Sequence, residues 1–153
     1  NTNPYLPTFG QLSAVSAVIR PAPGTYHVVF DSTTRAGAGP FTFRYWVGDE
    51  TPPRLRLLSR SVRRDGTLTF VASDAGAGID PDSIFGSVAG TGRTPTYAPK
   101  GNRMTITVPV GRLPAGRHRV RLQVSDHQEA KNMENALRIL PNTTVIDTTV
   151  TVR

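Results

Sequence analysis

The chain of 153 residues contains no cysteine, which excludes disulfide bridges and cysteine-ligated metal sites. It also lacks an apolar run long enough to span a bilayer, so we expect no membrane-spanning helix. Lysine is rare: Lys100 and Lys131 are the two lysines, and arginine supplies the other basic residues. Neither a disulfide framework nor a membrane anchor is therefore predicted to stabilise this chain.

The net charge is +7, from 18 basic and 11 acidic residues, which raises the question of a nucleic-acid partner. The arginines, however, alternate with apolar residues, as in Arg117, Arg119 and Arg121. This period of two places arginines on the solvent face of strands. Aromatic residues are not interleaved with the basic ones as they are in proteins that bind single strands. We therefore predict no nucleic-acid partner.

Short segments rich in β-forming residues recur along the chain, separated by Gly, Pro, Asp and Asn turns. After a Pro-Pro pair at Pro52 and Pro53, about seven of them fill 100 residues, which favours an all-β, antiparallel immunoglobulin- or fibronectin-like β-sandwich. Asp65-Gly66 between two of them is typical of a hairpin turn. The predicted strands are Arg54–Arg60, Thr67–Ser73, Ser83–Ala89, Thr94–Pro99, Arg103–Val108, Gly116–Ser125 and Thr144–Arg153.

The Pro-Pro pair also predicts a division of the chain, since two prolines stiffen the backbone and remove ladder hydrogen bonds. We expect residues 51–153 to form the sandwich and residues 1–50 to contribute strands of a second β-module. Those strands are predicted at Ala14–Ile19, Thr25–Phe30 and Phe41–Val47. Two or three strands are marginal alone, so their exposed edges predict pairing with another module or a homodimer.

The segment from Asp126 to Thr143 is long for a loop in a compact domain, and such loops are often functional. The spacing of Met133, Leu137 and Leu140 is that of a short amphipathic helix, which would cover the end of the sandwich instead. If the loop binds a ligand, its polar residues and a nearby indole are the candidates. They are Trp46, His127, Gln128, Glu129, Lys131 and Asn132. Because Trp46 lies beside the linker, we expect it to fill the inter-domain contact rather than to bind a sugar.

Three aspartates, Asp49, Asp74 and Asp126, each lie at the end of a strand or in the linker. Calcium prefers several oxygen ligands, and loop carboxylates with backbone carbonyls supply them. These three residues are the candidate calcium ligands, with Asp80 and Asp82 in a nearby Gly-rich loop. The competing interpretation is that each aspartate caps its own turn through backbone hydrogen bonds.

A catalytic constellation is not visible in the sequence. A nucleophile elbow, G-x-S-x-G, and a zinc motif, H-E-x-x-H, are both absent. The three histidines, His27, His118 and His127, lie in or beside predicted strands without an evident nucleophile partner. We therefore expect a chain that is not itself an enzyme.

Two groups of motifs resemble known bacterial modules. Asp49-Glu50-Thr51-Pro52-Pro53 resembles the opening of bacterial immunoglobulin-like repeats, and residues 73–80 (SDAGAGID) and 115–126 resemble later segments of the same repeats. The turn that usually follows lacks its glycine here. Residues 23–30 (PGTYHVVF) and 39–43 (GPFTF) resemble the end of a pre-peptidase C-terminal domain.

That pair of modules resembles the C-terminal tail of secreted subtilisin-like serine peptidases. The resemblance implies a secreted, non-catalytic accessory region of a bacterial hydrolase, whose partner is an upstream catalytic domain and whose substrate is a protein or polysaccharide. The arginine preference indicates a GC-rich, actinobacterial genome. The alternative is a module for cell-surface adhesion or carbohydrate binding, because sandwiches often bind ligands through their loops.

Overall fold

A computed structural model describes residues 23–27, 34–40, 42–47, 49–128 and 142–153, and it divides the chain into two compact units, Asn1–Phe43 and Arg44–Arg153. The first unit has one described element, the 3₁₀ turn η1 (Arg35–Gly37). The described parts of residues 25–30 and 41–47 are not strands, contrary to prediction, and residues 14–19 lie outside the described residues. The second unit begins seven residues before the predicted boundary.

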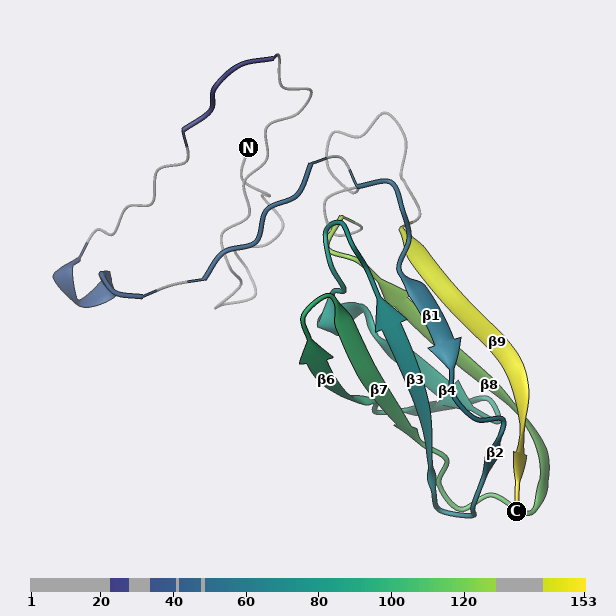
Figure 1. Ribbon diagram of the computed structural model, residues 1–153. Helices are drawn as coiled ribbons and strands as arrows, with labels where there is room; N and C mark the ends of the chain where they lie inside the picture. The colour runs from purple at the N-terminus through teal and green to yellow at the C-terminus, as the bar shows by residue number, and fades with distance from the viewer. Residues whose placement is uncertain (1–22, 28–33, 41, 48, 129–141) are drawn as a thin grey trace. The chain divides into compact units, whose positions relative to one another are not determined.

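The described residues of the second unit form two sheets that lie face to face (Figure 1). One sheet has the strand order β1-β3-β7-β6, and the other has the order β2-β9-β8-β4-β5. A 3₁₀ turn, η2 (Pro81–Ser83), precedes β4. The strands are β1 (Arg54–Leu57), β2 (Ser61–Val62), β3 (Thr67–Ser73), β4 (Phe85–Val88), β5 (Thr91–Arg93), β6 (Thr96–Lys100), β7 (Arg103–Pro109), β8 (Gly116–Ser125) and β9 (Thr143–Val152).

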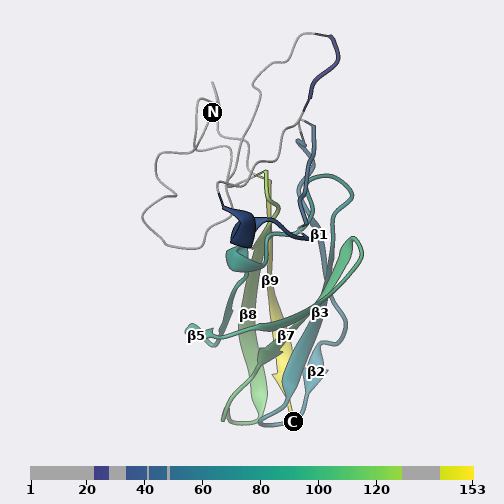
Figure 2. The same ribbon diagram turned by 90° about the vertical axis from the view of Figure 1, so that its left-hand side faces the viewer.

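This strand order is that of an immunoglobulin-type sandwich, in which strands that are distant in the chain lie side by side in each of the two sheets. All pairs are antiparallel except β2 with β9, which run parallel. Figure 2, turned by 90°, shows the same two layers from another side. The predicted all-β sandwich is confirmed.

The period-two pattern of the sequence explains the core. In β3, Leu68, Phe70 and Ala72 are buried, and the residues between them face outward. Ile106 in β7, the cross-strand neighbour of Phe70, and Leu122 in β8 of the other sheet are fully buried. Because alternate side chains point to opposite faces of a strand, each sheet presents one apolar face to the other. The core lies between the sheets.

Turn residues set the connections. Ala89 and Gly90 both have positive φ, of 52° and 78°, which is the conformation of a tight turn between β4 and β5. Asp65 also has positive φ, 59°, beside Gly66. The turn at Asp65-Gly66 exists, but the predicted hairpin is wrong, because β2 and β3 belong to different sheets. The chain crosses between the layers there, as it does between β1 and β2.

The edge formed by β6 is closed to further pairing by Pro99. Pro99 lies opposite Met104, next to the pair Lys100 and Arg103 that closes the hairpin. Antiparallel pairs alternate between hydrogen-bonded and outward-facing N–H groups, and a two-residue loop closes on a hydrogen-bonded pair. Pro99 therefore occupies a position at which a backbone N–H would point outward. Because proline has no N–H, this edge lacks one donor that a further strand would need for pairing.

Candidate functional site

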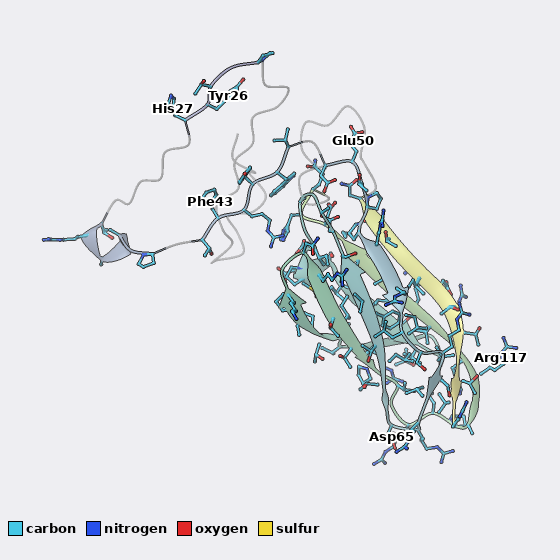
Figure 3. All side chains as sticks on the ribbon, viewed as in Figure 1. Tyr26, His27, Phe43, Glu50, Asp65 and Arg117 are labelled. Atoms are coloured by element: carbon cyan, nitrogen blue, oxygen red, sulfur yellow. The ribbon has the colours of Figure 1, made fainter. Side chains whose placement is uncertain are left out.

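Three buried aspartates meet at one end of the sandwich. Asp74 follows β3, Asp126 follows β8, and Asp49 lies in the segment that leads into β1. Oxygen atoms of the three carboxylates all lie within 4.8 Å of one another. The residues are only 9 %, 6 % and 0 % exposed in the order Asp49, Asp74 and Asp126. Figure 3 places Glu50, the neighbour of Asp49, at this end and Asp65 at the opposite end.

The loop after β3 folds around two of these carboxylates. Asp74 Oδ1 accepts hydrogen bonds from the backbone N–H of Gly76, at 2.9 Å, and of Gly78, at 2.7 Å. Asp49 Oδ2 accepts the N–H of Ala77 at 2.6 Å, and its Oδ1 accepts the N–H of Thr51 at 3.0 Å. Asp74 thus shapes its own loop, as turn capping requires, while Asp49 holds the incoming segment (residues 44–53) against that loop.

Asn142 joins the third aspartate to the first. Its side-chain Nδ2 donates to Asp126 Oδ2 at 3.0 Å and to the backbone carbonyl of Asp49 at 2.6 Å. The backbone N–H of Asp126 donates to the carbonyl of Asn142 at 3.2 Å, which brings the two ends of the long loop together. Asn142 was not among the predicted site residues. Asn142 follows Pro141 and directly precedes a strand. This pattern is too common in protein sequences to identify a site residue.

Two glycines make room for the incoming segment. A Cβ at Gly76 would collide with the carboxylate of Asp49, and a Cβ at Gly78 would collide with the guanidinium of Arg44. Gly78 also has a φ of +78°, which disfavours other residues. Arg44 Nη1 donates to the carbonyl of Ala77 at 3.0 Å. The glycines in this segment are therefore needed for close approach, and these contacts explain why the second unit begins at Arg44.

The donor set of the cluster suits a hard cation. Carboxylate oxygens are the ligands that calcium prefers, and each oxygen that accepts one hydrogen bond keeps a second lone pair. No Lys or Arg forms a salt bridge with Asp49 or Asp74 in the described part of the chain. Among the described residues this is also the one group of three acidic or histidine side chains close enough to hold a metal ion.

A pocket of about 310 Å³ adjoins the cluster. Its lining includes Asp74, Gly76 and Gly78 on one side and Asn102 and Arg103 of the β6–β7 hairpin on the other. Asp74 is therefore reachable from solvent, whereas Asp126 is covered.

The predicted loop-binding residues are brought together in part. The indole N–H of Trp46 donates to Gln128 Oε1, and the rings of Trp46 and His127 are tilted at 34° with centroids 6.3 Å apart. Glu129, Lys131 and Asn132 lie outside the described residues, as does the predicted helical spacing at Met133–Leu140. Trp46 fixes the incoming segment to the base of the long loop, which supports its contact role. Sugar binding at this indole stays a prediction.

Burial lowers the pKa of His127 below its ordinary value, and the positive charge of Arg44 lowers it further. Asp80, Asp82 and a hydrogen bond with the backbone of Ile79 act in the opposite direction on the same pKa. The neutral imidazole is therefore favoured beside the indole, as expected for a ring packed in a protein contact rather than exposed as a cation.

His118 lies outside the site. His118 is half-buried, and its Nε2 lies 2.9 Å from the carbonyl oxygen of Pro114. It is therefore a histidine whose ring nitrogen has a backbone partner at the rim of the sandwich. His27 belongs to the first unit and is exposed.

No protein-family profile matches the chain, and no curated protein sequence is significantly similar to it. In the described part of the chain, no helix has the length and apolar character needed to cross a membrane. The site must therefore be interpreted from its own chemistry.

Proposed function

We propose that the chain is a non-catalytic accessory β-sandwich of a secreted bacterial subtilisin-like serine peptidase, stabilised by a calcium ion held by Asp49, Asp74 and Asp126. The peptidase assignment is supported by the resemblance to two modules, at residues 23–30 and 39–43 for the first and at residues 49–53, 73–80 and 115–126 for the second. The calcium assignment is supported by one observation, the meeting of three buried carboxylates at the end of the sandwich where the chain enters it.

The electrostatic cost of this cluster is the reason for expecting a cation. Two unit charges 4.8 Å apart, the greatest separation in the cluster, repel by about 3.5 kcal/mol at an effective dielectric constant of about 20. The hydrogen bonds from Ala77, Gly76 and Gly78 offset part of the cost, but amides carry no full charge. A divalent ion between the carboxylates converts the repulsion into attraction.

Such an ion would connect three separate parts of the chain. Asp49 belongs to the incoming segment, Asp74 to the loop after β3, and Asp126 to the base of the long loop. An ion bound to all three carboxylates would hold the incoming segment against the end of the sandwich. It would therefore stiffen the connection between the sandwich and the preceding part of the chain. This is the role expected of an accessory module that spaces or positions a catalytic domain.

The peptidase assignment is tested in the parent protein. The gene that encodes this chain should encode a hydrolase domain upstream, and deletion of residues 44–153 should shorten the thermal half-life of the secreted peptidase. We expect kcat/KM on a short peptide substrate to stay within about twofold, because the module holds no catalytic group. A gene without a hydrolase domain contradicts the proposal, as does a large loss of kcat/KM at a temperature where both forms are folded.

A further inference from the structure

The outer face of the four-stranded sheet carries four cations. Arg54 and Arg56 of β1, Arg103 of β7 and Lys100 of β6 are all exposed. The pairing register places Arg54 opposite Ser73, Ser73 opposite Arg103, and Arg103 opposite Lys100. We call these four residues and the outward positions between them the basic face. Three of its cations therefore lie in one row across the sheet.

These cations are not compensated. The four strands of this sheet contain no Asp or Glu, and none of the four cations forms an ion pair with a described residue. The other sheet differs, because Arg119 of β8 binds Asp147 of β9 through two hydrogen bonds of 2.7 and 2.6 Å. Its guanidinium lowers the pKa of the Asp147 carboxyl. The other sheet also carries Arg117 and Arg121 on β8, but Asp147 lies among its cations, whereas the strands of the basic face contain no acidic residue.

Hydroxyl groups occupy several outward positions on this face, while Val71 lies opposite Arg56 and Ala98 opposite Thr105. Thr69 of β3 lies opposite Thr107 of β7, which lies opposite Thr96 of β6. Thr105 and Ser73 occupy the outward positions nearer the cations. Hydroxyls both donate and accept hydrogen bonds. The face therefore offers charge for anions and paired donors and acceptors for sugar hydroxyls.

We propose that the basic face binds a linear glycan whose sugar units carry carboxylates. Arginine recognises carboxylate through its paired N–H donors. Phe70 is buried in the core, and Tyr97, 49 % exposed on the edge strand β6, lies by register on the side of the core residue Ile106, so the basic face has no outward ring on which a nucleic-acid base would stack. Charge and hydroxyls without rings fit an acidic polysaccharide better than a single-stranded nucleic acid. The proposal is independent of the calcium site.

The test uses the whole chain and polygalacturonate as the probe, with neutral dextran and duplex DNA as comparison polymers. The double variant Arg56→Gln with Arg103→Gln removes two cations from the basic face. The matched control, Arg117→Gln with Arg121→Gln, removes the same charge from β8 of the other sheet, where Arg117 projects away from the sandwich (Figure 3). Binding is measured by isothermal titration calorimetry at low and at physiological salt, after thermal unfolding has shown that both variants fold.

We expect the basic-face variant to bind polygalacturonate about tenfold more weakly and the control variant to change by less than about twofold. The salt dependence of binding should also fall in the basic-face variant. Equal losses in the two variants would show attraction by net charge alone and would overturn the proposal. Tighter binding of duplex DNA, equal binding of dextran, or no binding of polygalacturonate at low salt would also overturn it.

Discussion

Replacement of Asp74 by Asn separates the charge of the acidic cluster from its hydrogen bonds. Asp74 accepts the N–H groups of Gly76 and Gly78 through the same oxygen, Oδ1. The amide oxygen of Asn can accept both, so the loop after β3 should keep its conformation. What changes is one negative charge beside Asp49 and Asp126. The variant therefore tests whether the carboxylates hold an ion or only cap turns.

We expect Asp74→Asn to lower the stability relative to the wild type in the presence of calcium, and not to lower it in the absence of calcium. Extracellular calcium modules bind with dissociation constants of about 0.1–1 mM. At 10 mM calcium, the wild type should gain about 1.4–2.7 kcal/mol of unfolding free energy from ligand linkage. For a domain of this size, that gain raises the unfolding midpoint by roughly 6–20 °C. In EDTA, the variant loses two repulsions of about 3.5 kcal/mol each at an effective dielectric constant of about 20, so it should be at least as stable as the wild type.

The assay is thermal unfolding followed by circular dichroism, in EDTA, in 10 mM calcium and in 10 mM magnesium. Asp65→Asn is the matched control, because it removes the same charge at the opposite end of the sandwich, and Asn tolerates the positive φ of that residue. The control should respond to calcium as the wild type does. A wild-type midpoint that does not move at 10 mM calcium would refute the calcium assignment. A loss of more than about 1 kcal/mol by Asp74→Asn in EDTA would refute the repulsion argument.

Three further substitutions test the packing. Gly76→Ala should destabilise the second unit by about 1–3 kcal/mol in urea unfolding, because its Cβ meets a carboxylate, whereas Gly92→Ala, with open space around it, should cost less than 1 kcal/mol. Equal costs would contradict the close approach. Phe70→Ala, in the core, should cost about 3–5 kcal/mol, and the exposed Phe85→Ala about 0.5 kcal/mol or less, by the same measurement. Pro99→Thr should restore an outward N–H on β6, leave stability within about 0.5 kcal/mol, and increase self-association measured by light scattering. An unchanged mass at high concentration would show that the proline does not protect this edge.

The alternation of side chains determined most of the sandwich. A strand with one buried face must alternate apolar and outward residues, so β3, β7 and β8 are readable from the sequence almost to the residue. The short strands β2 and β5 were missed, since two or three residues carry no period. The hairpin at Asp65-Gly66 was predicted wrongly for a related reason. A turn motif predicts that the chain reverses direction, but it does not indicate which sheet the next strand joins.

The three aspartates of the site were predicted from the sequence by itself, because each follows a strand or lies in the linker. Strand ends gather at the two ends of a sandwich. Only the tertiary structure decided that the three meet within 4.8 Å, that Asn142 bridges two of them, and that Gly76 and Gly78 admit Asp49 and Arg44. The physical reason is the separation along the chain of the residues that make each contact. Alternation and turn chemistry are local properties of the chain, whereas these contacts join residues 16 to 93 positions apart, and their geometry depends on how the two sheets pack.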